Sequence, residues 1–394
     1  MFRSFWMGGF EGSCHRYQGR QLDLVAASGH AAQVGVDYGL LAGAGVLTVR
    51  DAVRWHLVEA GVEAGGERDW SSWDPMVAAA GAAGVQVIWD LVHYGVPEGV
   101  DVWGAGFVER VAAFAGAAAG RLMGSVEGPR VWVPMNEISF WAWAGGDVAY
   151  LHPAAAGRGD ELKRQLARAG IAAARAIRAV DPAARLVWPE PVIHIAGHPE
   201  RPEEWAAAEA YRTAQYEAWD MVSGRLCPEL GGAPELLDVV GVNFYFNNQW
   251  IHGAPPRGGE TLALGHRSFR PFSAMLGEVY ERYGRPVLVS ETGAEGGAEG
   301  GNGPGWLRYV AGEVRDAGAA GVEVTGVCVY PVMDYPGWTD GRHCACGVIA
   351  CDGDWAGRRM RPEMVGVLDE VRALGEGRAS VAVRHRDHFV AVRQ

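Results

Sequence analysis

Short apolar segments alternate with longer helix-like segments along the whole chain, and this alternation restricts the possible folds more than any other feature. The short segments are nearly continuous in Val, Ile, Leu and aromatic residues, as expected of strands that are covered on both faces. Strands are predicted at residues 4–9, 45–50, 85–91, 131–136, 185–189, 238–244, 286–290 and 325–330. Helices are predicted at residues 20–42, 73–83, 104–123, 160–180, 203–224, 268–283, 304–318 and 361–373. Eight strand–helix units in this order predict an α/β protein with a single-domain (β/α)8 TIM barrel.

The barrel is predicted to occupy residues 1–374, and the remaining tail, 375–394, is predicted to form a hairpin or a small cap. The segments that follow the strands are longer than those that follow the helices, and they are rich in Gly, Pro, Trp, His and Asn. Loops at the carboxyl ends of barrel strands carry the active site of such folds. No G-x-G-x-x-G motif follows the first strand, which disfavours a dinucleotide-binding fold and a nucleotide cofactor.

Composition excludes several classes of function. The chain has 394 residues and a formal net charge of −12, which argues against a nucleic acid or an anionic membrane as partner. No apolar run is long enough to cross a bilayer, and the N-terminal segment lacks the order of a secretory signal, so we expect a cytoplasmic protein. Lys163 is the only lysine and falls in a polar stretch of a predicted helix, which argues against Schiff-base chemistry. Oligomeric state is left open.

The cysteines are too sparse for a disulfide scaffold, but three of them cluster with a histidine near the C-terminus. His343, Cys344, Cys346 and Cys351 could be read as a zinc site. Their spacing does not match a common zinc module, and the segment is predicted to be a loop. We therefore expect no cofactor and no metal, and a zinc-dependent hydrolase stays as a separate hypothesis.

Two glutamates each close an apolar strand. Glu137 ends the segment 131–137, and Glu291 ends the segment 286–291. A carboxylate at such a position is costly unless it faces a cleft and has partners, although an acid at a helix start is also a common cap. The carboxyl ends of parallel barrel strands open onto one face, and two carboxylates delivered there can break a glycosidic bond.

The neighbours of the two glutamates differ in a way that suits two different roles. Trp132, Phe140, Trp141 and Trp143 could form an apolar wall that keeps Glu137 protonated as a general acid. Beside Glu137, Asn136 is a neutral donor suited to a sugar 2-hydroxyl. Two other strand-end residues, Arg50 and Tyr245, could keep Glu291 ionised as a nucleophile.

These residues carry a resemblance to a known family. Asn136-Glu137 at the fourth strand and Glu291 at the seventh resemble the signature of the clan A retaining glycoside hydrolases. The closest resemblance is to glycoside hydrolase family 1, the β-glucosidase type. Further segments resemble that family in the first, sixth and eighth strands: Phe5-Trp6-Met7-Gly8, Val239-Val240-Gly241-Val242-Asn243-Phe244-Tyr245 and Tyr330-Pro331-Val332-Met333-Asp334-Tyr335-Pro336-Gly337-Trp338, followed by Gly347-Val348.

The resemblance implies a role for each matched residue. It implies that Glu137 is the acid/base, Glu291 the nucleophile and Tyr245 the donor to the nucleophile. It further implies that Arg50 lies beside the nucleophile, that Asn136 contacts the 2-hydroxyl and that Trp338 lines the glycone pocket. Asn243 lies in the matched sixth strand.

The sequence departs from the family's pattern at residues that recognise the sugar. The family's acid for distal glycone hydroxyls is Gly337 here, its eighth-strand tryptophan is Tyr330, and its first-strand glutamine has only Glu11 and His15 as nearby candidates. Its third-strand His-Trp-Asp is matched by Ile88-Trp89-Asp90, with His93 displaced along the loop. Trp89 and His93 are therefore candidates for binding the sugar or supporting its site, with packing in the core or a loop as the alternative for each, and the glycone is left undefined. Aromatic residues in the loops, Trp89, Tyr94, Trp103, Trp141, Trp143, Trp250 and Trp338, could stack on sugar rings.

The sequence therefore predicts a retaining β-glycosidase that acts on a small glycoside or an oligosaccharide through a covalent glycosyl-enzyme. Its two carboxyl groups should lie about 5–5.5 Å apart. Two alternatives stay open: a transglycosidase on the same scaffold, and a barrel that binds carbohydrate without catalysis.

Overall fold

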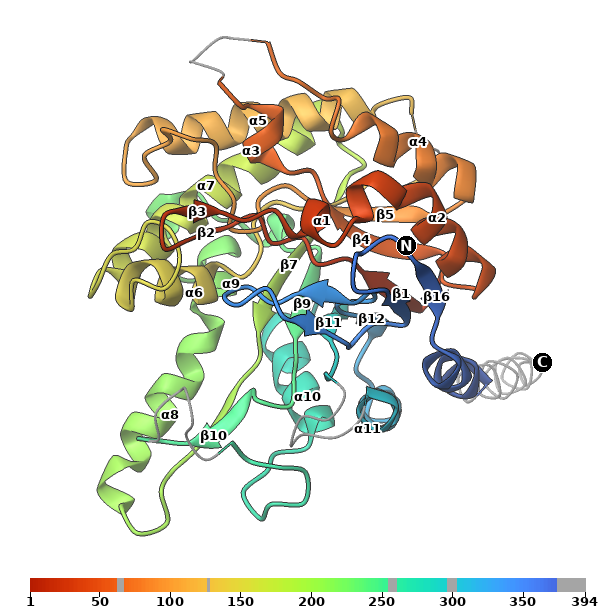
Figure 1. The fold of residues 1–394 in the computed structure, drawn as a ribbon. Helices are drawn as coiled ribbons and strands as arrows, with labels where there is room; N and C mark the ends of the chain where they lie inside the picture. Colours follow the sequence, from red (N-terminus) through yellow and green to blue (C-terminus); the bar gives the residue numbers. More distant parts are fainter. Residues whose placement is uncertain (62–66, 126–127, 254–260, 296–302, 374–394) are drawn as a thin grey trace, which may run out of the picture.

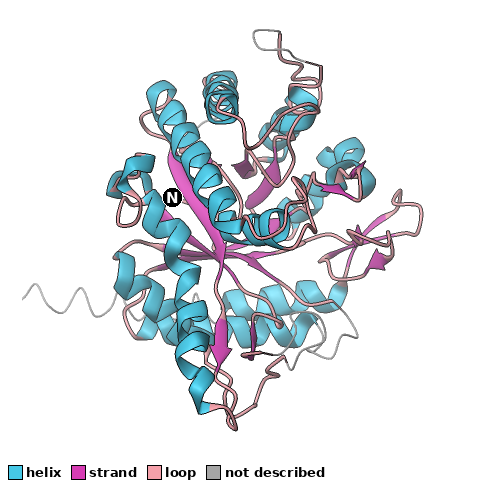
Figure 2. Ribbon diagram, turned by 90° about the vertical axis from the view of Figure 1, so that its left-hand side faces the viewer, coloured by secondary structure: helices cyan, strands magenta, loops and turns pink. Residues whose placement is uncertain are grey.

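The computed structural model describes residues 1–61, 67–125, 128–253, 261–295 and 303–373. Eight parallel strands close into a barrel in chain order, and the last strand pairs with the first. Figure 2 shows the strands at the centre with helices around them. The barrel strands are β1 (Trp6–Gly9), β4 (Thr48–Ala52), β5 (Gln86–Asp90), β6 (Val131–Val133), β7 (Arg185–Pro191), β9 (Val239–Asn243), β11 (Val287–Thr292) and β12 (Val324–Val329). The predicted (β/α)8 barrel is confirmed.

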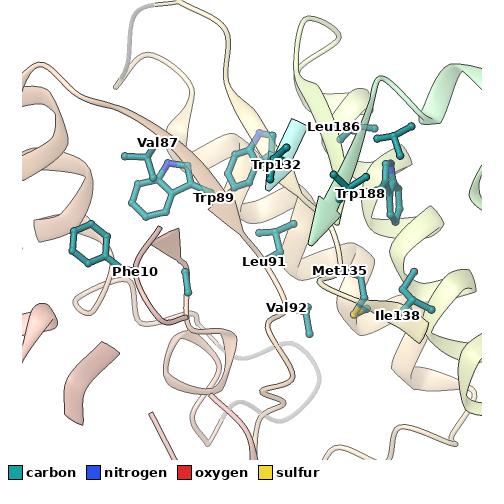
Figure 3. Packing of buried hydrophobic residues seen from close by; sticks show 14 of the residues in the cluster. Phe10, Val87, Trp89, Leu91, Val92, Trp132, Met135, Ile138, Leu186 and Trp188 are labelled. Atoms are coloured by element: carbon teal, nitrogen blue, oxygen red, sulfur yellow. The ribbon is translucent and has the colours of Figure 1, made fainter. Parts of the chain in front are cut away.

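Side chains alternate between the two faces of each strand and build two cores. The inner core fills the barrel with Met7, Ile88, Val131, Val133, Val187, Val239, Leu288, Cys328 and Tyr330. The outer core lies between strands and helices, and Figure 3 shows part of it, including Trp89, Trp132 and Trp188. Burial on both faces is the reason why these strands are apolar runs without a polar face.

Most predicted helices are present, with two differences. The described helices around the barrel are α2 (His30–Gly43), α4 (Asp74–Ala83), α5 (Gly106–Leu122), α7 (Gly159–Val180), α9 (Glu217–Val222), α10 (Phe272–Tyr283) and α11 (Gly303–Ala319), followed by a helix at 362–373. A further helix, α8 (Trp205–Thr213), precedes α9 and packs mainly on residues 194–196. The predicted first helix begins too early, because 16–21 form the hairpin of β2 (Arg16–Tyr17) and β3 (Arg20–Gln21), followed by the short α1 (Leu24–Ala27). The fifth helix is split in two around a short 3₁₀ turn, Ala214–Tyr216.

The long segments after the strands contain secondary structure that the sequence did not predict. A short helix, α6 (Ile138–Trp141), and a π-helix at Ala142–Asp147 follow β6. Two small parallel strands, β8 (His194–Ala196) and β10 (Gln249–Ile251), pair beside α8 at the lower edge of Figure 1. Further short pairs follow β12: β13 (Tyr335–Pro336) with β14 (His343–Cys344), and β15 (Ile349–Cys351) with β16 (Arg358–Met360). The tail predicted at 375–394 lies outside the described residues.

A buried ionic cluster ties the N-terminal third of the barrel to the C-terminal segment. His30 contacts Asp37 through Nδ1 at 2.7 Å and Asp51 through Nε2 at 2.8 Å. On β16, Arg358 binds the second oxygen of Asp37 at 2.8 Å. These groups are almost fully buried, so removing one partner leaves an uncompensated charge, which is strongly destabilising. None of the described helices is both long enough and apolar enough to cross a bilayer.

Candidate active site

A cavity of about 680 Å³ lies where the barrel strands end, and we call it the main cavity. Strand-end residues from different parts of the chain line it, including Glu137 after β6 and Glu291 in β11. Its other lining residues include Glu11, His93, Tyr94, Phe140, Trp143, Tyr150, Lys163, Tyr211, Tyr245, Trp250, Tyr330, Gly337, Trp338, Asp340 and Arg342.

Glu137 sits on a strained turn between β6 and α6. Its φ of 44° lies in the left-handed region, which non-glycine residues rarely adopt and which is often found at functional sites. Asn243 donates to its Oε1 at 2.7 Å, and the hydroxyl of Tyr94 donates to its Oε2. Burial and then the charge of Glu291 raise the pKa of Glu137 to about 8. Glu137 is therefore protonated at neutral pH, as a general acid requires.

Glu291 has different partners. Arg50 donates to its Oε1 at 2.6 Å, and the hydroxyl of Tyr245 donates to its Oε2 at 2.9 Å. Burial raises the pKa of Glu291, while Arg50 and Tyr245 oppose this change. Because the two carboxyl groups are coupled, one proton near neutral pH stays on the group without a cation partner. That group is Glu137, so the negative charge resides on Glu291.

Arg50 connects the two carboxyl groups through one hydrogen-bond chain. Its Nη2 donates to Oδ1 of Asn136 at 2.7 Å, which turns the Asn136 amide nitrogen toward Tyr94 and His93. Tyr94 accepts from Asn136 at 3.1 Å and donates to Glu137. The chain therefore fixes both catalytic candidates from one buried cation, and such connected networks rigidify a site.

Asp90 and His93 complete the support of Arg50. Asp90 binds Arg50 through two bonds, at 2.9 and 2.7 Å, and accepts from Nδ1 of His93 at 2.9 Å. Burial opposes the charge on Asp90, but Arg50 and His93 keep its pKa below the usual range. Since Nε2 of His93 accepts from Asn136 at 3.0 Å, both ring nitrogens are used within the protein.

The structure brings most of the predicted site residues together. Glu11, His93, Tyr330 and Trp338 line the main cavity with Glu137, Glu291 and Tyr245. Three others, Arg50, Asn136 and Asn243, are buried behind the cavity surface and hold the two glutamates. The amide of Asn136 is fully engaged with protein partners, so its place is in the support of the site rather than on the cavity wall.

Two predicted residues lie elsewhere. Trp89 packs edge-to-face on Trp73 with a centroid distance of 5.2 Å in the outer core, because Ile88 and Asp90 on either side of it point into the barrel. The prediction that Trp89 contacts a sugar is wrong for this geometric reason. His15 is buried behind the cavity wall, where its ring lies 4.6 Å from that of Trp338.

Two residues that the sequence analysis did not assign to the site, Glu190 and Lys163, lie at or near the main cavity. Glu190, at the end of β7, accepts from the backbone N–H of Ser139 at 3.0 Å and thereby holds the turn that carries Glu137. Burial raises the pKa of Glu190 to about 7. The signal for it was a strand-end acid between Pro189 and Pro191. Lys163 lines the cavity in an ion pair with Glu217 at 2.6 Å, so its helical position did not place it away from the site.

At Gly337, which has no side chain, neighbouring residues form the wall of the main cavity. A Cβ added at Gly337 would lie 2.5 Å from Oδ1 of Asp340 and 3.3 Å from Cγ of Arg342. The space that a larger side chain would need is thus occupied by the side chains of Asp340 and Arg342. Asp340 and Arg342 line the cavity instead, and Arg342 is held by Glu295.

The predicted zinc candidates do not gather around a common point in the described chain. His343 binds Asp334 at 3.1 Å and stacks on Trp355. The one described group with metal-compatible spacing is Cys14, Asp23 and His56. Asp23 is already used there, since it caps α1 through the N–H of Ala26 at 3.0 Å and pairs with Arg54 at 3.4 Å.

Comparison with known proteins identifies similar structures only. No protein-family model matches the chain, and no curated protein matches it. A family 1 β-glucosidase from Thermotoga maritima superposes with a TM-score of 0.72 at 15% identity, covering 93% of this chain and 97% of that one. The virulence factor SghA, solved with its substrate analogue salicin, superposes with a TM-score of 0.71 at 19% identity, covering 87% and 85%. At these identities the similarity establishes a shared fold.

Proposed function

We propose that this protein is a retaining β-glycosidase, a divergent relative of glycoside hydrolase family 1. The observation that supports this most directly is the pair Glu137 and Glu291 in one cavity, one protonated and one ionised. Two carboxyl groups held in different protonation states on the open face of a barrel are the machinery for glycoside cleavage. The similarity to β-glucosidases, including the complex titled with glucoimidazole, adds support for a sugar substrate.

The proposed reaction is a double displacement. A carboxylate oxygen of Glu291 attacks the anomeric carbon, the bond to the leaving oxygen breaks, and Glu137 gives its proton to that oxygen. Glu137, now a carboxylate, takes a proton from water as the water attacks the anomeric carbon and releases Glu291. Each displacement inverts the anomeric centre, so the product keeps the configuration of the substrate.

The supporting residues are assigned by what they touch. Arg50 and Tyr245 hold the charge of Glu291 in the resting enzyme and orient its attacking oxygen. Tyr94 and Asn243 orient Glu137, and Trp338 offers an aromatic face to the glycone. The turn at Asp340 replaces a side chain at Gly337, so we propose that the glycone preference differs from that of a simple glucosidase.

A panel of aryl β-glycosides, with the product anomer followed by NMR, tests the proposal. Hydrolysis with retained configuration is expected for at least one of the glucoside, galactoside, mannoside, xyloside and fucoside. A 2-fluoro sugar of the accepted type should label Glu291 covalently, whereas a barrel that only binds carbohydrate would not be labelled.

The variant Glu291→Ala identifies the nucleophile. It is expected to lose hydrolysis by several orders of magnitude, and azide should restore turnover with an inverted glycosyl azide as product. Trp89→Phe, which alters an aromatic residue outside the cavity, serves as the matched control. If Glu291→Ala keeps parental turnover on every accepted substrate, the assignment fails.

A further inference from the structure

A second cavity of about 1020 Å³ lies next to the main cavity. The loops after the first four barrel strands surround it, from the β2–β3 hairpin to the segment that follows α6. Trp143 and Tyr150 line both cavities, so these two aromatic residues form the boundary between them. The second cavity therefore adjoins the proposed catalytic site along these two residues, which we call the aromatic ridge.

Aromatic rings follow one another from the main cavity into the second cavity. Trp338 lies 6.3 Å from Phe140, and Phe140 lies 5.8 Å from Trp143, measured between ring centroids. Beyond the ridge, Tyr150 lies 5.5 Å from Tyr17, which lines only the second cavity. These neighbouring rings are inclined to one another by 63°, 42° and 69°, so they offer both apolar faces and edges to a chain of sugar units, whose C–H faces are apolar and whose rims form hydrogen bonds.

Polar groups in the second cavity suit a neutral, hydroxyl-rich ligand. Gln18, Gln21, His56 and His152 contribute polar side chains to its lining. Arg16 and Glu98 place one charge of each sign at the cavity, so neither an anion nor a cation is favoured. Polar side chains together with aromatic ones are typical of sites that bind a neutral ligand through hydrogen bonds and apolar contact.

We propose that the second cavity binds the outer sugar units of a β-linked oligosaccharide whose terminal unit occupies the main cavity. This inference rests on the proposed function and names its substrate class. The direction follows from Glu137, which gives its proton to the leaving group: the same segment that carries Glu137 continues into Trp143 and Tyr150. The leaving group therefore extends over the ridge toward Tyr17. The substrate is a chain of several sugar units rather than a small aryl glycoside.

The test compares a tyrosine of the second cavity with a tyrosine of the main cavity. Tyr17 lies only in the second cavity, and Tyr211 on α8 lies only in the main cavity, where it contacts Trp250. For the parent, Tyr17→Ala, Tyr17→Phe and Tyr211→Ala, kcat/KM is measured on an aryl glycoside and on a β-linked tetrasaccharide of the same glycone. Tyr17→Ala should lower the tetrasaccharide-to-aryl ratio about tenfold, mainly through KM, since a lost aromatic contact weakens binding by about this amount. Tyr17→Phe keeps the aromatic ring and should therefore keep the parental tetrasaccharide-to-aryl ratio.

A binding experiment separates this inference from the proposed function. On a Glu137→Gln background, the Kd for cellotetraose, laminaritetraose and mannotetraose is measured by calorimetry. At least one should bind, and Tyr17→Ala should raise its Kd about tenfold. An unchanged ratio or Kd in Tyr17→Ala, a lower ratio in Tyr211→Ala alone, or no tetrasaccharide binding would overturn the second-cavity assignment. A parent that hydrolyses no glycoside would instead refute the proposed function, and the Kd measurement would still decide the role of the cavity.

Discussion

Replacing Glu190 with Gln should move the alkaline limit of activity toward lower pH. Glu190 is 2% exposed and holds the turn of Glu137 through the N–H of Ser139. Gln keeps an oxygen that can accept from this N–H, but it removes the negative charge. Burial and the charge of Glu291 raise the pKa of Glu137 most, and the negative charge of Glu190 raises it further. Without it, Glu137 should lose its proton at a lower pH.

The size of the shift follows from electrostatics. Two like charges separated by roughly 6–10 Å at an effective dielectric constant of about 20 repel each other by roughly 1.7–2.8 kcal/mol. One pKa unit corresponds to about 1.4 kcal/mol, so the full interaction would raise the pKa of Glu137 by about one to two units. The pKa of Glu190 is itself about 7, so most but not all of this charge is present when Glu137, with a pKa of about 8, titrates. We therefore expect the alkaline limb to fall by about one pH unit.

The assay is the pH dependence of kcat/KM for two aryl glycosides, one with a poor leaving group and one with a good one. The shift should be clear with phenyl glycoside, which needs protonation of the leaving oxygen, and weak with 2,4-dinitrophenyl glycoside. Glu59→Gln is the control, because Glu59 is 1% exposed but does not line the main cavity. A limb that stays within about 0.2 pH unit of the parental value in Glu190→Gln would refute the electrostatic role of Glu190.

Two further predictions concern catalysis and stability. Tyr245→Phe removes the hydroxyl that donates to Glu291 at 2.9 Å. Rapid kinetics should show the glycosylation step slowed about 10- to 100-fold, as expected for loss of a hydrogen bond to a charged group. An unaltered glycosylation rate would contradict the role of Tyr245. Burial opposes the charge on His30, but Asp51 and Asp37 outweigh burial and raise its pKa to about 9. This raised pKa contributes stability that is fully present below about pH 6.5 and is lost as the pH rises through 9, on the order of 3 kcal/mol in all. Urea unfolding should show this decline in the parent, and the same slope in His30→Gln would contradict the assignment.

Local pattern was sufficient to predict the barrel. Strands buried on both faces must be short and apolar, and the helices between them must carry one apolar side, so the eight-fold alternation is visible without any long-range information. The small strand pairs β8–β10 and β13–β14 were not predicted, because two or three residues of strand leave no periodic signal. The split of the fifth helix was missed for a related reason, since its apolar pattern runs through the 3₁₀ turn.

Residue type and strand-end position selected most of the candidate site, while side-chain direction was decided by the tertiary structure. Trp89 illustrates the difference: it neighbours Asp90 in sequence, but the pleat turns it to the opposite face of the strand. Glu190 came to hold the turn of Glu137, and Lys163 came to line the same cavity, only when β7 and α7 took their places in the barrel.

The sequence alone determined the order of strands and helices and the position of two acids at the ends of two strands. Both features depend only on residues that are neighbours along the chain. Only the folded barrel decided that Arg50 reaches Glu291 directly and Glu137 through Asn136 and Tyr94. Protonation state depends on burial and on charges far apart in sequence, so the difference between the two glutamates arises when the strands close into the barrel.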